Sequence, residues 1–167
     1  SQLNPAERIL MGPGPSSVSN RVLKALASPT LGHLDPQYVQ IMDETCALLR
    51  EVFQTQNKMT FPVSGTGMAG METLAVNLLE PGDEALVCVN GAFGGRMKDV
   101  MERCGAIVHT VESAWGEIIT DEAAAEAIAA HPKAKLFAIV HAETSTGAHQ
   151  PLINISKSAH DAGMLFL

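Results

Sequence analysis

The sequence predicts an α/β protein, with a three-layer fold in which helices cover both faces of a mostly parallel sheet. The main observation is the order of elements, because strand-like apolar runs alternate with helical patterns from about residue 59 onward. Only 4% of the residues are aromatic and 46% are hydrophobic, with Ala, Leu, Val and Met plentiful, which favours closely packed helices. A chain of 167 residues is also long enough to bury a substantial core.

Two helices are expected before the alternating part. Ser19 or Asn20 can cap a first helix over 21–27, whose Val and Leu residues form one apolar face. Asp35 precedes a proline that suits a first helical turn, so it is expected to cap a second helix that continues over 38–53.

From residue 59, strands and helices follow one another with Gly-rich or Pro-rich turns between them. We expect strands over 59–64, 84–89, 106–111, 135–141 and 164–167, and helices over 67–79, 95–103, 121–130 (capped by Thr120) and 155–162. Such an alternation implies crossover connections and parallel strands. The sequence stops inside its last apolar run, so we expect it to be part of a longer protein.

Charge and composition exclude several classes. The net charge is −7 and no basic run appears, so a nucleic-acid partner is not expected. No apolar run approaches the roughly 18 residues needed to cross a bilayer, and no signal peptide is recognisable, so we expect a cytoplasmic protein without membrane contact. The three cysteines are isolated, which is typical of buried reduced thiols, and neither C-x-x-C nor H-E-x-x-H suggests a metal site.

The segment Gly65-Thr66-Gly67-Met68-Ala69-Gly70 spells G-x-G-x-x-G between an apolar run and a helical pattern. This pattern is typical of a dinucleotide-binding turn, but the following strand should then end in an acidic residue that holds the ribose. That strand ends in Asn90-Gly91, which argues against NAD. A phosphate monoester at the helix start is favoured instead, because free N–H groups, the helix dipole and nearby hydroxyls would all stabilise its negative charge. The alternative is that the glycines only permit close helix packing.

Further candidates lie where the other strands are expected to end. Phe93 follows a Gly-rich strand end and could stack on a planar cofactor or pack in the core. His141, Glu143, Thr144 and Ser145 form one cluster, in which acid–base chemistry is one possibility. The other is that one or two of them bind a ligand while the rest fix the loop.

Six motifs together resemble the N-terminal part of class V, fold-type I, pyridoxal-phosphate aminotransferases. They are "MGPGPSSVSNRVLKAL", "LGHLDPQYVQIMDE", "VFQTQN", "VSGTGMAGMETLAVNLLEPGD", "NGAFGGR" and "HAETSTGAHQPL", in this order. Within the class the chain is most similar to the alanine–glyoxylate and serine–glyoxylate (serine–pyruvate) aminotransferases. The resemblance implies pyridoxal 5'-phosphate as cofactor, amino acid and oxo-acid substrates, and a homodimer. It also implies a truncated large domain over 36–167, with residues 1–35 lining the entrance of the active site.

The resemblance also assigns roles to single residues. The family's phosphate-binding turn falls on Ser64, Gly65 and Thr66, the ring-stacking aromatic falls on Phe93, and a hydroxyl near the cofactor's phenolic oxygen falls on Thr144. Many relatives have Trp in place of Phe93. Substrate contacts are implied for Gly14, in the "GPGP" segment, and for His33 in "LGHLDP".

Three residues of the family are expected beyond residue 167: the aspartate that binds the pyridinium nitrogen, the lysine that binds the cofactor covalently and the arginine that binds the substrate carboxylate. No catalytic residue is therefore assigned in this chain, and the chain alone is expected to be inactive. The implied reaction transfers an amino group from a small amino acid such as alanine or serine to glyoxylate. One alternative is a ureidoglycine–glyoxylate aminotransferase of purine breakdown. A second, of another class, is a non-catalytic phosphate-binding or dimerisation module, and a third is an NAD oxidoreductase.

Overall fold

The computed structural model describes residue 3 and residues 5–167. The chain forms two compact units, Ser1–Pro62 and Val63–Leu167, which are treated separately below. The proposed entrance role of residues 1–35 stays a prediction, and residues 1, 2 and 4 of that segment lie outside the described part.

The first unit contains the two expected helices, α1 (Asn20–Leu26) and α2 (Pro36–Val52). The expected cap of α2 is confirmed, because an Asp35 carboxylate oxygen accepts the Gln37 N–H at 2.8 Å. Ser19 occupies the N-cap position of α1, but its side chain makes no capping hydrogen bond. Neither helix buries a residue within the described part of the chain.

The strand expected over 59–64 is wrong. These residues form an irregular segment at the boundary between the units, and residues 61–64 are exposed. Pro62 has no N–H to donate to a ladder, and no strand in the described part of the chain pairs with this segment. An apolar run becomes a strand only where a neighbouring strand accepts its backbone hydrogen bonds.

The second unit is built on a four-stranded parallel sheet, which confirms the predicted fold class. Its strands are β1 (Glu84–Val89), β2 (Ile107–Glu112), β3 (Leu136–Ala138) and β6 (Leu165–Phe166), in the order β2-β1-β3-β6. All three pairings are parallel. The strand expected over 135–141 is observed over a shorter range, as β3.

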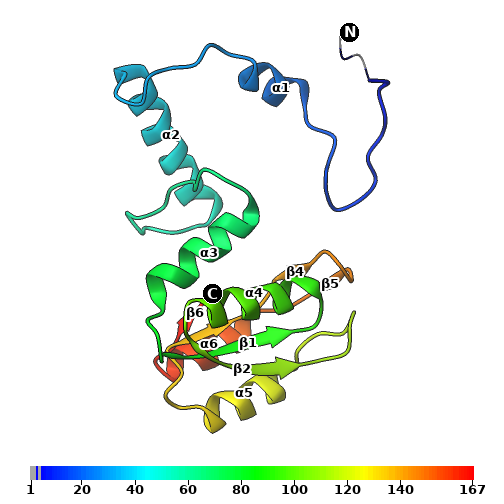
Figure 1. The fold of residues 1–167 in the computed structure, drawn as a ribbon, viewed down its shortest axis with the longest axis vertical. Coiled ribbons are helices and arrows are strands. Elements are labelled where there is room, and N and C mark those ends of the chain that lie inside the picture. Colours follow the sequence, from blue (N-terminus) through cyan, green and yellow to red (C-terminus); the bar gives the residue numbers. More distant parts are fainter. Residues whose placement is uncertain (1–2, 4) are drawn as a thin grey trace. The chain divides into compact units, whose positions relative to one another are not determined.

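Helices cover both faces of this sheet (Figure 1). They are α3 (Gly67–Leu78), α4 (Ala92–Arg103), α5 (Asp121–Ala130) and α6 (Ile153–Asp161). Alternate residues of β1 point to opposite sides. Ala85 and Val87 pack in the core under α3 and α4, whereas Leu86 and Cys88 pack in the core under α5 and α6. The long buried run of β1 is therefore typical of a central parallel strand.

A short antiparallel hairpin was not predicted. It consists of β4 (Ala142–Glu143) and β5 (Ala148–His149), and it follows β3 at the carboxyl end of the sheet. The buried Gln150 side chain lies just after it and exchanges two hydrogen bonds with the backbone of Ile119, of 2.8 and 3.0 Å. This pairing joins the hairpin to the loop before α5. No helix in residues 3 and 5–167 has the length and apolarity that spanning a membrane requires.

Candidate functional site

The predicted ligand-binding residues of the second unit gather at one edge of the sheet. In this unit each helix runs antiparallel to the strands, so α3 ends where β1 begins and α4 starts where β1 ends (Figure 1). The N-termini of α3 and α4 therefore lie toward the carboxyl ends of the strands, where open α/β sheets bind their ligands. The β4–β5 hairpin lies at the same edge and contacts α4.

The start of α3 is a tight turn that requires glycine at position 65. Thr66 is the N-cap, and its hydroxyl accepts the Ala69 N–H at 3.4 Å. Gly65 has a φ of +156°, and a Cβ on it would lie 2.8 Å from the Cβ of Ala69. Any side chain at position 65 would therefore push the helix away from the turn.

This helix start is open. Within the described part of the chain, no protein atom accepts a hydrogen bond from the N–H of Gly67 or Met68. Residues 64–67 are exposed, and Ser64 and Thr66, which both carry hydroxyls, lie in the turn before these N–H groups. Unpaired N–H groups, hydroxyls and the positive end of a helix dipole form a donor set that suits a phosphate group.

The start of α4 differs from the start of α3, because the chain itself provides acceptors for its first N–H groups and so closes it to a ligand. Its N-cap is Gly91, which has no side chain to accept a hydrogen bond. Instead Glu143 Oε2 accepts the N–H of Phe93 at 2.9 Å and of Gly94 at 3.3 Å. The Ser145 hydroxyl oxygen accepts the N–H of Ala92 at 3.0 Å. The chain itself thus satisfies the first three N–H groups of α4.

Glu143 is held firmly in this position. It is 1% exposed, and its Oε1 accepts the Ser145 N–H at 3.1 Å and the Ser145 hydroxyl at 2.7 Å. Burial raises the pKa of the Glu143 carboxyl, but the hydrogen bonds from Ser145, Phe93 and Gly94 outweigh burial and hold the pKa below its ordinary value. The group is therefore a carboxylate at neutral pH.

Gly91 and Gly94 leave room for close contacts at the start of α4. A Cβ on Gly91 would lie 2.4 Å from Cγ and 2.5 Å from Cδ of Glu143. A Cβ on Gly94 would lie 2.6 Å from the carbonyl oxygen of Cys88 and 2.9 Å from Cα of Val89. Both glycines are therefore required by space, one for the carboxylate and one for close packing of α4 on β1.

The structure links the segments that carry Phe93 and Thr144, because Thr144 follows Glu143 directly and Glu143 accepts the backbone N–H of Phe93. The Phe93 ring is half-buried, and the Arg96 guanidinium carbon lies 5.1 Å from its centroid. Thr144 is exposed in the hairpin turn. Gly14 and His33 are exposed residues of the first unit, and their contact with a substrate stays a prediction.

Sequence reasoning left the role of Glu143 open between acid–base chemistry and fixing the loop. The geometry favours the second, because both carboxylate oxygens are engaged by the backbone and by Ser145. No separate role was predicted for Ser145. The available signal was a helix that starts at a glycine with no capping side chain, together with an acidic residue at a neighbouring strand end.

Two other features lie away from this edge. Glu84, His109 and His131 offer ligand atoms within 4.8 Å of one another, although the sequence contains neither C-x-x-C nor H-E-x-x-H. His109 Nε2 lies 3.1 Å from the Glu84 carboxylate, and the two imidazole rings stack at 3.7 Å. Hydrogen bonding and stacking account for the arrangement without an ion. The three residues belong to the start of β1, the middle of β2 and the end of α5.

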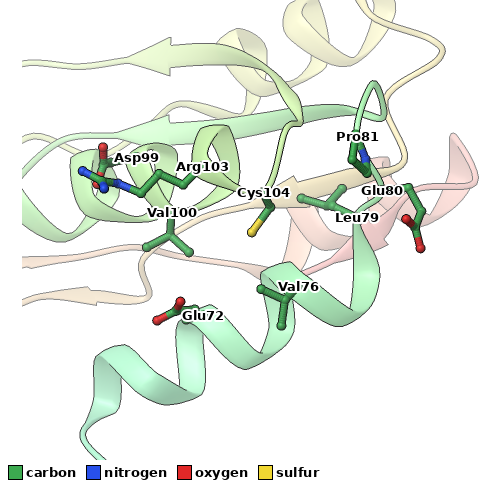
Figure 2. A pocket seen from close by; sticks show the side chains of 9 residues that line it. All are labelled: Glu72, Val76, Leu79, Glu80, Pro81, Asp99, Val100, Arg103 and Cys104. Atoms are coloured by element: carbon green, nitrogen blue, oxygen red, sulfur yellow. The ribbon is translucent and has the colours of Figure 1, made fainter.

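The second feature is a groove of about 560 Å³ between the later turns of α3 and α4 (Figure 2). Val76, Leu79 and Val100 line it with apolar groups, and Arg103 forms an ion pair with Asp99 at 2.8 Å beside it. Its helical lining lies beyond the first turns of both helices, so the groove is separate from the two helix starts.

The chain matches one protein family and several known proteins. The profile of the family described as Aminotransferase class-V matches residues 16–167. The chain is 43% identical over 161 residues to an alanine–glyoxylate aminotransferase of Rattus norvegicus, covering 96% of this chain and 39% of that protein. It is 39% identical over 160 residues to a (S)-ureidoglycine–glyoxylate transaminase of Bacillus subtilis, covering 96% of this chain and 38% of that protein.

Two solved structures are similar along nearly the whole chain. An alanine–glyoxylate aminotransferase from Nostoc sp. has a TM-score of 0.92 and 45% identity, and the match covers 99% of this chain and 45% of that one. A ureidoglycine–glyoxylate aminotransferase from Bacillus subtilis has a TM-score of 0.95 and 38% identity, covering 99% and 43%. The chain thus spans about two fifths of the length of the curated relatives it matches, in their N-terminal part.

Proposed function

The chain belongs to the class V aminotransferase family, and on this premise we propose that it forms the phosphate-binding and ring-binding part of a pyridoxal-phosphate-dependent transaminase. The family and its alanine–glyoxylate members use pyridoxal 5'-phosphate. The observation that carries the proposal for this chain is the contrast between the two helix starts, since α4 is closed by Glu143 and Ser145 while α3 keeps free donors.

Each candidate residue then has a defined task. The N–H groups at the start of α3 and the hydroxyls of Ser64 and Thr66 bind the phosphate. The Phe93 ring packs against the pyridine ring, and the Thr144 hydroxyl donates to its phenolic oxygen. The bound cofactor supplies an electron sink for reaction at the substrate's Cα. None of this chain's lysines matches the family's covalent lysine, and we propose that this lysine belongs to the part of the relatives' length that the chain does not span.

For the reaction we propose transfer of an amino group from a small amino acid, such as alanine or serine, to glyoxylate. The support is the identity of 43% and 45% to two alanine–glyoxylate aminotransferases. Ureidoglycine is the second candidate donor, because the backbone is also similar to a ureidoglycine–glyoxylate aminotransferase, with a TM-score of 0.95. Gly14 and His33 are the proposed substrate contacts in the first unit.

We also propose a homodimer in the cytoplasm. The first unit supports a second copy, because α2 leaves the apolar side chains of Leu48 and Val52 exposed to 60% and 74%. All three cysteines are free thiols, which suits a reducing compartment. Size-exclusion chromatography with light scattering on the full-length protein would return a monomer mass if the dimer is wrong.

The phosphate assignment is tested by comparing pyridoxal 5'-phosphate with pyridoxal, which lacks the phosphate. In the full-length protein, Thr66→Val should weaken binding of the phosphorylated form by about tenfold, the value of one hydrogen bond to a charged group. The affinity for pyridoxal should stay unchanged. Glycine formation from glyoxylate with alanine, serine or ureidoglycine then identifies the donor.

Thr120→Val is the matched control. Thr120 caps α5 as Thr66 caps α3, with its hydroxyl accepting the Ala123 N–H at 3.1 Å, but it lies outside the predicted cofactor site. It should lower helix stability similarly and leave both affinities unchanged. Equal weakening by the two substitutions, or equal effects on the two ligands, would refute the phosphate assignment.

A further inference from the structure

We propose that Glu143 is a positioning residue of the cofactor site, whose buried carboxylate fixes the start of α4 and so holds Phe93 in place beside Thr144. The inference rests on the proposed function, because it takes Phe93 and Thr144 as the residues that face the cofactor. Glu143 itself is assigned no contact with the cofactor or the substrate.

The first argument is the set of bonds that one short segment makes to the start of α4. Residues 143–145 provide an acceptor for each of the first three N–H groups of the helix, at 2.9 to 3.3 Å. A helix normally receives these acceptors from a local N-cap side chain or from water. Here they come from about fifty residues along the chain, so the same bonds that cap α4 also tie it to the β4–β5 hairpin.

The second argument is that the carboxylate has no alternative position. It fills the space that a Cβ on Gly91 would occupy, and its side chain is 1% exposed. Gly91 has φ 176° and ψ −169°, an extended backbone that other residues adopt, so space rather than conformation requires glycine there. No Lys or Arg in the described part of the chain forms an ion pair with Glu143. The N–H dipoles and the positive end of α4 stabilise its charge instead.

The consequence concerns both geometry and charge. The hairpin turn is itself held by the Glu143 carbonyl oxygen, which accepts the N–H of Thr146 at 3.2 Å and of Gly147 at 2.8 Å. One residue thus fixes the helix that carries Phe93 and the turn that carries Thr144. Its negative charge also occupies the start of α4, which leaves the start of α3 as the site for a phosphate.

The test uses the full-length protein and the variant Glu143→Gln. Glutamine keeps the size of the side chain and one acceptor oxygen, but its amide nitrogen faces the Ser145 donors or those of α4. We expect the dissociation constant for pyridoxal 5'-phosphate to rise by up to about tenfold, because a less fixed Phe93 ring packs less well against the cofactor. The visible circular dichroism of the bound cofactor should weaken, because the aromatic ring beside it is less fixed. Amide hydrogen exchange at residues 92–94 should quicken about tenfold or more.

Two further variants separate positioning from general stability. Ile128→Val removes one methylene from the buried core under α5, on the opposite face of the sheet, and should leave the affinity, the dichroism and exchange at 92–94 unchanged. Ser145→Ala removes the acceptor of the Ala92 N–H and the hydroxyl that donates to Glu143 Oε1, but it keeps the carboxylate bonds to Phe93 and Gly94, so it should give a smaller change in the same three quantities. It also serves as the test if Glu143→Gln does not fold.

The outcomes are distinct. Wild-type affinity, dichroism and exchange in both Glu143→Gln and Ser145→Ala would overturn the positioning role while leaving the proposed function intact. The positioning role would also be overturned if Ile128→Val changed the affinity, the dichroism and the exchange rates as much as Glu143→Gln and Ser145→Ala do. A wild-type protein that does not bind pyridoxal 5'-phosphate would overturn the proposed function and the positioning role together.

Discussion

Replacing Gly91 with alanine tests how tightly Glu143 is packed against the start of α4. The new Cβ would lie 2.4 Å from Cγ, 2.5 Å from Cδ and 2.8 Å from Oε2 of Glu143. Because the backbone at Gly91 is extended, alanine adds no conformational strain there. The whole cost of the substitution should therefore come from displacing the carboxylate.

The magnitude follows from what the displacement breaks. Overpacking a tight site costs about 1–3 kcal/mol. Moving the carboxylate also lengthens its bonds to the N–H groups of Phe93 and Gly94, and a hydrogen bond to a charged group contributes about 1.5–3 kcal/mol. We expect Gly91→Ala to lower the free energy of unfolding by about 3 kcal/mol in total, since the clash and the lost bonds are partly alternatives to each other.

Urea unfolding of Gly91→Ala, Glu143→Ala and the double variant provides the assay, with the wild type as reference. Once Glu143 is shortened, the methyl group at position 91 has room, so its cost should fall below about 1 kcal/mol. A cost of Gly91→Ala that is the same with and without the Glu143 side chain would refute the reasoning. It would show that the glycine is needed for another reason.

Three further predictions concern the same unit. Gly94→Ala should destabilise the protein by about 2 kcal/mol or more, because its Cβ would meet the backbone of β1. Gly95→Ala has open space at its Cβ position and should be neutral or stabilise the protein by up to about 1 kcal/mol. Thermal unfolding of the two variants compares these effects. Burial raises the pKa of the Cys88 thiol to about 12, so a thiol reagent should modify at most the other two cysteines in the native protein and all three in urea. Because its pKa is lowered in the folded state, the Glu143 carboxylate stabilises the fold above its unfolded pKa of about 4.5, and this contribution is lost as the pH falls through the lower folded value. The difference in unfolding free energy between wild type and Glu143→Gln should therefore shrink on acidification below about pH 4.5. A difference that grows would contradict the assignment.

The sequence predicted the elements that local patterns determine. The caps Asp35 and Thr120 accept backbone N–H groups as expected, and each precedes the expected helix. The central strand 84–89 was predicted with its observed bounds, because it is apolar throughout and flanked by turn residues. Capping and buried-strand patterns are readable because they depend on neighbours in the chain.

Elements that depend on distant partners were not predictable in the same way. The apolar run 59–64 fits a strand but finds no partner among the described residues. Helix α4 begins at Ala92, three residues before the predicted start, because acceptors from the hairpin stabilise a first turn that contains two glycines. No local pattern places Glu143 next to Phe93.

The residues of the candidate site were predictable from the sequence, but the state of the two helix starts was not. The resemblance to a family suggested Ser64, Gly65, Thr66, Phe93 and Thr144, and the helix-start argument independently favoured the first three as a phosphate site. The difference between an open α3 and a closed α4 required coordinates, because both helices follow Gly-rich turns in the sequence. Satisfied and free N–H groups can be told apart only when their acceptors are placed.

A crystal structure of the full-length protein with pyridoxal 5'-phosphate would test the central claim most directly. The account predicts phosphate oxygens within hydrogen-bond distance of the N–H groups at the start of α3 and of the Ser64 or Thr66 hydroxyl, with the pyridine ring against Phe93. Glu143 should remain bonded to the start of α4. A phosphate bound at the start of α4 with Glu143 displaced, or a cofactor bound away from both helix starts, would contradict the account.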